Sequence, residues 1–264
     1  MNIFLHELKA NFKSFIIWCV IMGLFVVTGA AKFSAYANNP EMLSILDNFP
    51  KAVLDALNMI SFNLTTVTGF FGVMFVYFAL MGSIAAAMWG SGIISKEERD
   101  KTVEFSLVLP VSRSRVITAK AIAALIYCIA FVLVTWGASI VASRSYTPDQ
   151  AFFSFLRLEM LALFMIELIF LAIGLLLGCA MKQYKLSGSA AVGIILVTYF
   201  MSIVVTLDSR LDFLKYFTPF QYYDAGQLFR SGHLDTLYLA LSAAIIVVCV
   251  AAAYLTYNHR DLYI

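Results

Sequence analysis

The sequence predicts an all-α polytopic membrane protein: six transmembrane helices, an N-terminal interfacial helix, and a further helix in the loop between spans two and three. Hydrophobic residues make up 62% of the 264 residues and charged residues 13%, whereas soluble domains contain roughly 45–50% apolar and about 25% charged residues. The mean hydropathy is +0.88. No polar stretch is long enough for a separate soluble domain, so we expect one transmembrane domain over residues 1–264.

Six apolar segments have the length that a membrane crossing requires, which is about 20 residues for a hydrocarbon core about 30 Å thick. They lie at about residues 15–31, 67–94, 116–141, 158–181, 186–207 and 237–257. An even number of spans places both termini on one side of the membrane.

The residues before the first span form an amphipathic pattern. The apolar members recur at helical spacing and are Ile3, Phe4, Leu8, Phe12 and Phe15. The polar members are expected to face away from them and are Asn2, Glu7, Lys9 and Lys13. This pattern predicts a helix lying in the membrane interface. A cleavable signal sequence is the alternative, although the apolar stretch is longer than the roughly 7–15 residues of a signal core.

The distribution of basic residues predicts the orientation. With the N-terminus inside, eleven of the 18 Lys and Arg residues fall on the cytoplasmic side, as the positive-inside rule requires. The outside loops are then residues 32–66, with an amphipathic run at 42–59, and residues 208–236. The second of these holds Pro219 among aromatic residues, which favour the membrane interface, so we expect it to dip into the membrane.

The charged loop between the second and third spans carries the strongest functional pattern. A helix from about Glu97 to Leu109 would place Val103 and Leu107 on one side and the charged residues on the other. Pro110 would end this helix. A charged amphipathic helix braced between two spans suits the binding of a protein partner. The alternative is an ordinary solvated loop, because charge runs are often no more than that.

This loop resembles that of the membrane permease subunits of type 2 ATP-binding-cassette (ABC) exporters. The matching residues are Glu97 or Glu98, Thr102, Glu104, Leu107, Pro110, Val111, Ser112, Arg113 and the downstream Lys120. The chain departs at Lys101, where the family often has Gly. Two further segments are similar to the family pattern, namely Thr218-Pro219-Phe220-Gln221-Tyr222 and Arg260-Asp261-Leu262.

The resemblance implies a transport subunit of an ATP-driven exporter. In that family the loop helix is a coupling helix that sits in a groove of a cytoplasmic ATPase. The expected partners are two ATPase subunits, a second permease copy or paralogue, and membrane lipid. Spans one, two and five would line the path between the two permeases. The expected location is the plasma membrane of a bacterium, with both termini cytoplasmic.

The chain itself is not expected to be an enzyme or to hold a cofactor. It has no GxxxxGK[ST] loop for phosphate, so ATP and Mg would be bound by the partner ATPase. The three histidines lie outside the spans and no CxxC spacing occurs, which argues against an intramembrane hydrolase and a metal site. Gly90-Ser91-Gly92 then indicates close helix packing.

Glu167 is the acid deepest in a predicted span, and such a group is a functional candidate by default. It would line the substrate path, pair with a partner subunit, be protonated, or reach the interface through a tilted helix. Arg157 and Glu159 are expected to be interfacial anchors.

The cargo is not readable from the sequence. Abundant Phe, Met and Leu favour an amphipathic or antimicrobial peptide slightly over a lipid-like molecule or an ion. An ATP-independent secondary carrier and a membrane-embedded assembly factor are the rival functions.

Overall fold

The computed structural model describes residues 3–37, 48, 50, 54, 59, 61–99, 111–181 and 183–259, with backbone alone for residues 97–99, 184 and 209. These residues form helices and no strand. The long helices are α1 (Ile3–Phe33), α4 (Val67–Arg99), α6 (Arg113–Ser143), α7 (Gln150–Ala180), α8 (Tyr184–Leu207) and α11 (Thr236–His259). The short elements are η1 (Arg144–Tyr146), η2 (Ser209–Phe217), α9 (Pro219–Tyr222) and α10 (Ala225–Ser231).

All six long helices are long and apolar enough to cross a membrane, which confirms the predicted six-span plan. Most are longer than the predicted apolar segments; α1 and α7 each contain 31 residues. At a rise of 1.5 Å per residue such a helix is about 46 Å long. It therefore extends beyond a hydrocarbon core of about 30 Å at its polar ends.

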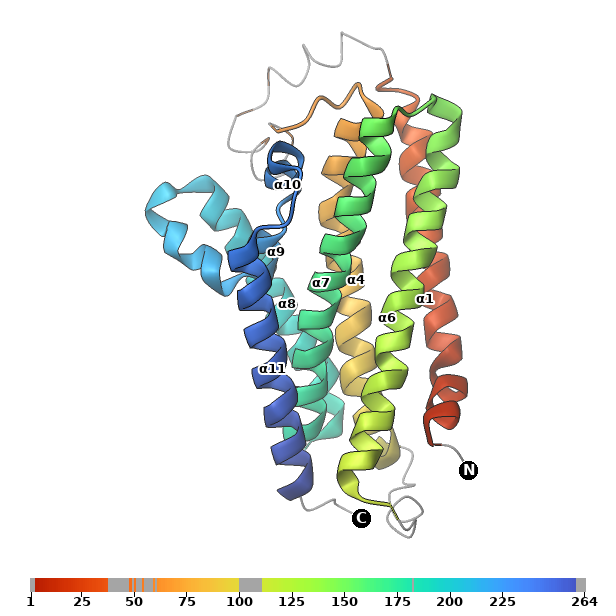
Figure 1. The fold of residues 1–264 in the computed structure, drawn as a ribbon, viewed down its shortest axis with the longest axis vertical. Coiled ribbons are helices and arrows are strands. Elements are labelled where there is room, and N and C mark those ends of the chain that lie inside the picture. Colours follow the sequence, from red (N-terminus) through yellow and green to blue (C-terminus); the bar gives the residue numbers. More distant parts are fainter. Residues whose placement is uncertain are drawn as a thin grey trace.

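Helix α4 lies at the centre of the bundle. It packs most extensively against α7 and also contacts α1, α6 and α8 (Figure 1). Its most apolar stretch is 72% buried within the chain, compared with 28% for α1, 22% for α8 and 17% for α11. The last three helices therefore expose most of their apolar surface to the membrane or to a partner.

The α4–α7 contact depends on small residues. A Cβ atom at Gly90 would lie 2.6 Å from the carbonyl oxygen of Leu171, and one at Gly174 would meet the backbone of Ala87. The predicted close packing is thus confirmed for Gly90. Gly92 has open space instead, because it lies on a different side of α4.

Helix α1 differs from the prediction in two ways. The residues expected to form a separate interfacial helix are continuous with the first span, from Ile3 to Phe33. Glu7 was expected on the polar side, yet it is 3% exposed and faces the bundle, whereas Phe12 is 54% exposed. The face that packs inward is set by contacts with α6 and α4, and in a membrane an apolar residue such as Phe12 is equally at home against lipid.

The segment between α8 and α11 turns back along the bundle, and its dip into the membrane stays a prediction. Thr218 donates a hydrogen bond to the carbonyl of Thr198 at 2.8 Å, about 13 Å below the end of α8 by helix rise. The Phe220 ring lies 5.5 Å from that of Phe170, in the second half of α7. The amphipathic run predicted at 42–59 falls almost wholly outside the described residues.

One end of the bundle carries the beginning of α1, the end of α4, the beginning of α6 and the end of α11 (Figure 1). We call it the predicted cytoplasmic end. The first and last spans thus have their outer chain ends on the same side. That this side is the cytoplasm remains a prediction from the basic residues.

Candidate functional site

The predicted coupling residues are only partly within the described structure. Thr102, Glu104, Leu107 and Pro110 lie outside the described residues, as does the Arg-Asp-Leu segment that begins at residue 260. The backbones of Glu97 and Glu98 belong to the last turn of α4. The other three coupling residues, Val111, Ser112 and Arg113, are described at the beginning of α6.

Ser112 is the N-cap of α6. Its backbone is extended (φ −69°, ψ 148°) and its hydroxyl accepts a hydrogen bond from the backbone N–H of Arg115 at 3.4 Å. Serine is a favoured residue here because its oxygen satisfies a backbone donor that the helix cannot. The cap fixes where α6 begins after the predicted coupling segment.

Arg113 binds the end of α11. Its guanidinium Nη1 donates to the carbonyl oxygens of Tyr257 at 3.4 Å and Asn258 at 3.3 Å. A cation there suits the partial negative charge at a helix C-terminus. One turn further on, the hydroxyls of Thr118 and Tyr254 lie 2.6 Å apart. The beginning of α6 is therefore fixed to α11, whereas the nearby Arg115 is exposed.

On its other side, α6 is joined to α1 and α4 by a buried charge. Lys120 is fully buried, and its Nζ lies 3.7 Å from Oε1 of Glu7 on α1. The same Nζ donates to the carbonyl oxygen of Ile93 on α4 at 2.9 Å. Glu7 also accepts a hydrogen bond from the side chain of Asn11 at 3.4 Å. The sequence did not predict this pair. The one local signal is that Glu7 shares a helical face with Asn11, Ser14 and Trp18, which are all partly buried.

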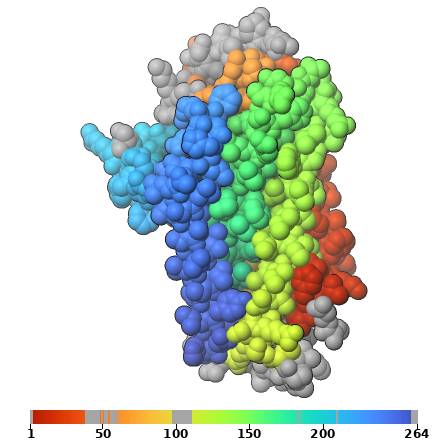
Figure 2. Space-filling view, in the orientation of Figure 1, coloured from red at the N-terminus to blue at the C-terminus, as the bar shows by residue number. Residues whose placement is uncertain are grey.

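Aromatic residues continue the same contact. Phe15 stacks on Tyr127 with ring centroids 5.0 Å apart, and Trp89 lies 5.7 Å from Tyr127. The Tyr127 hydroxyl donates to the carbonyl of Leu8, and the Trp89 indole donates to Ser14 at 3.3 Å. In the space-filling view the first residues of α1 emerge directly beside α6 at this end (Figure 2). Helices α1, α4 and α6 thus share one polar and aromatic contact.

Glu167 is fully buried within the chain. Its carboxyl oxygens have no hydrogen-bond partner among the described residues. Gly82 on α4 leaves the room for it, since a Cβ there would lie 2.9 Å from Glu167 Oε1. The Cys128 thiol on α6 lies beside it. The site is therefore enclosed by α4, α6 and α7 and offers one acid without a charged partner.

Glu159 was expected to be an interfacial anchor, and this was wrong. It is fully buried two turns before Glu167, and neither of its carboxyl oxygens has a hydrogen-bond partner among the described residues. The reason is that its helical position turns it toward the bundle interior. Arg157, two residues earlier, is exposed as predicted.

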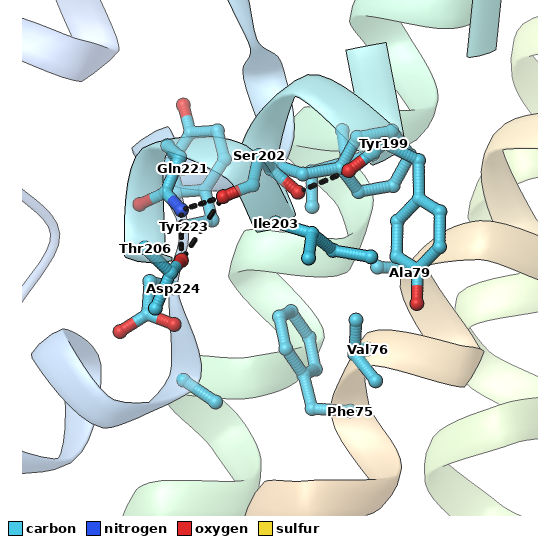
Figure 3. A pocket seen from close by; sticks show the side chains of 13 residues that line it. Phe75, Val76, Ala79, Tyr199, Ser202, Ile203, Thr206, Gln221, Tyr223 and Asp224 are labelled. Atoms are coloured by element: carbon cyan, nitrogen blue, oxygen red, sulfur yellow. Dashed lines mark hydrogen bonds between the residues drawn. The ribbon is translucent and has the colours of Figure 1, made fainter. Parts of the chain in front are cut away.

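A small polar hollow of about 50 Å³ lies where the returning segment meets α4 and α8 (Figure 3). Gln221 donates to the carbonyl of Ser202 at 2.8 Å and to the hydroxyl of Thr206 at 3.0 Å. Ile166, and not Glu167, contributes the α7 side chain. A space of this size holds a few water molecules at most, so it is not a cavity for a peptide or lipid.

The exposed part of the same loop carries an ion pair. Lys215 Nζ lies 2.6 Å from the Asp212 carboxylate, and this hydrogen bond raises the pKa of Lys215. Among the residues that the structure describes, no three His, Cys, Asp or Glu side chains are grouped so that they could hold a metal ion.

Comparison with known proteins adds one match. A family model described as "ABC-2 family transporter protein" matches residues 1–262. No curated protein matches the chain.

Proposed function

The chain belongs to the ABC-2 transporter family, and from this we propose that it is the permease subunit of an ATP-driven exporter. Family membership makes it the membrane component of an ABC transporter, a class that works with ABC ATPases. The proposal adds that two separate ATPase subunits bind and hydrolyse ATP with Mg, and that this chain has no ATP site of its own.

We place the ATPase contact at the segment between α4 and α6, with Glu97, Glu98, Thr102, Glu104, Leu107 and Pro110 as its docking residues. The observation that carries this is the way α6 begins. Arg113 fixes it to α11, and Lys120 fixes it to α1 and α4. A force applied to the segment just before Ser112 would reach four helices within two or three helical turns.

A second permease copy, or a paralogue, would complete the transport path. Helices α1, α4 and α8 expose apolar side chains, among them Leu24 (61%), Met88 (44%) and Val197 (61%). The hollow beside α8 is too small for cargo. A path between two copies would supply a larger space than this hollow. Amphipathic peptides remain the favoured cargo class, with lipid-like molecules and ions as the alternatives.

The coupling role is tested with Glu104→Ala and Arg113→Ala in the complex purified with its ATPase. We expect Glu104→Ala to weaken ATPase copurification and Arg113→Ala to lower the hydrolysis rate. A hydrogen bond to a charged group contributes about 1.5–3 kcal/mol, so losses of roughly tenfold or more are expected. Arg115→Ala is the matched control, because this arginine is exposed. Unchanged association and hydrolysis in both variants would reject the coupling role.

An ATP-independent secondary carrier remains the second candidate, and a membrane-embedded assembly factor a third. The buried carboxyls of Glu159 and Glu167, which have no charged partner among the residues that the structure describes, favour the carrier, since a buried acid in a membrane protein is a common ion-binding group. A carrier would copurify with no ATPase. It would also take up or release protons or Na⁺ in reconstituted vesicles, and Glu167→Gln would abolish this flux.

A further inference from the structure

The buried Glu7–Lys120 pair lies where three helices meet. Lys120 reaches from α6 to Glu7 on α1 (3.7 Å) and to the carbonyl oxygen of Ile93 on α4 (2.9 Å). The Glu7 side chain is 3% exposed and the Lys120 side chain is 0% exposed. One side chain therefore holds together the helices on both sides of the segment at residues 100–110 and the first helix of the chain.

Packing alone does not require charges at this position. Phe15, Trp89 and Tyr127 already pack α1 against α4 and α6. Burying an ion pair costs desolvation, so a pair of apolar side chains would hold the helices at least as well. A buried ion pair is directional, whereas apolar packing is not. The geometry of the pair favours one arrangement of the three helices and penalises others.

Helix α1 also contacts α4 further along its length, where the Phe25 ring lies 6.1 Å from that of Phe78 and the Phe33 ring lies 5.2 Å from that of Phe70. Its outward side chains include Leu5, Ile17 and Leu24, each more than half exposed. Without the ion pair, α1 would keep these aromatic contacts and the Trp89–Ser14 hydrogen bond. It would lose the charged contact that joins its first turns, through Lys120, to the end of α4.

From these contacts we propose that Glu7 and Lys120 are positioning residues that make α1 move together with the ends of α4 and α6. The proposal rests on the proposed function, in which an ATPase acts on the segment between α4 and α6. It deepens that function by naming the contact that would transmit movement during ATP hydrolysis to α1 and to the exposed apolar face of this helix.

The test uses spin labels on the complex purified with its ATPase. Labels at Leu5→Cys and Met88→Cys report the separation of α1 and α4, and both positions are well exposed (52% and 44%). The partly exposed Cys19 and Cys249 are replaced by serine, and the buried Cys128 and Cys179 are kept. Distances are measured without nucleotide and with ATP trapped by vanadate.

With Glu7 and Lys120 intact, we expect the same distance between the two labels in both nucleotide states. Glu7→Gln and Lys120→Met should each make the distance between the labels depend on nucleotide, with a shift of about 2 Å, the upper end of typical helix shifts in switching proteins. The double variant Glu7→Gln/Lys120→Met removes both charges of this pair, so it is the variant expected to fold best. It should show the same shift as the single variants, because the two residues act as a unit.

Lys9→Met is the matched control, since it removes an exposed positive charge two residues from Glu7. A purely structural role would change or broaden the distance equally in both nucleotide states, and this result would overturn the proposal. An unchanged distance in the double variant would also overturn it, while leaving the ATPase contact intact. Failure of the chain to copurify with an ATPase would instead overturn the proposed function and this inference with it.

Discussion

Burial of the Glu159 carboxyl lowers the stability of the fold, and no described contact compensates for it. Both of its carboxyl oxygens are enclosed and without a hydrogen-bond partner among the described residues. A buried polar group without a partner costs about 1–3 kcal/mol. Glu167, about two turns further along the same helix, is also fully buried, so the two acids concentrate an unfavourable contribution on α7.

We therefore expect Glu159→Met to raise the melting temperature of the purified protein in detergent. A gain of 1 kcal/mol corresponds to roughly 2–4 °C for a chain of this size. The exposed Arg157 provides the control, and Arg157→Met should change the melting temperature little. A lower melting temperature for Glu159→Met would mean that the carboxyl has a partner in the assembled transporter.

The residue scale is also where the sequence is least informative. Membrane helices are apolar on the side that faces lipid and on the side that faces the bundle, so hydrophobic spacing does not separate the two. For this reason the pattern placed Glu7 outward and Glu159 at the interface, whereas both are buried. The contact of Arg113 with Asn258 joins residues far apart in the chain, and no local pattern could have predicted it.

At the scale of elements, the sequence predicted considerably more. All six spans were found, because length and hydropathy alone determine which helices can cross a membrane. Pro219 and the aromatic residues around it predicted a segment that dips into the membrane, and the segment packs back against α8 and α7. The continuity of α1 was missed, because an amphipathic pattern does not reveal whether a helix bends at the membrane surface.

The glycines of α4 allow a direct test of its packing against α7. Gly90→Ala should lower stability by about 1–3 kcal/mol, the usual cost of overpacking, because its methyl group would press against the carbonyl of Leu171. Gly92→Ala is the matched control on the same helix, since nothing lies within 4 Å of a Cβ there. Thermal unfolding in detergent measures both. Equal changes in the two variants would show that the α7 contact does not decide the effect, because the higher helix propensity of alanine acts at both positions.

For the whole molecule, the main prediction is its orientation. Arg115 and Arg144 lie at opposite ends of α6, and both are exposed. In intact cells, a membrane-impermeant maleimide should label Arg144→Cys, and it should label Arg115→Cys only after the membrane is permeabilised. The positive-inside rule is the physical reason. The reverse labelling pattern would place both termini outside and remove the proposed ATPase contact from the cytoplasm.

The tight contact between α4 and α7 limits how the molecule can change shape. Sliding or rotation of one helix past the other would press Gly90 or Gly174 against the backbone of the opposing helix. Backbone atoms cannot move aside as a flexible side chain can. We therefore expect α4 and α7 to move as one rigid unit. Any rearrangement of the bundle would then occur where the surrounding helices contact this pair, and not between α4 and α7 themselves.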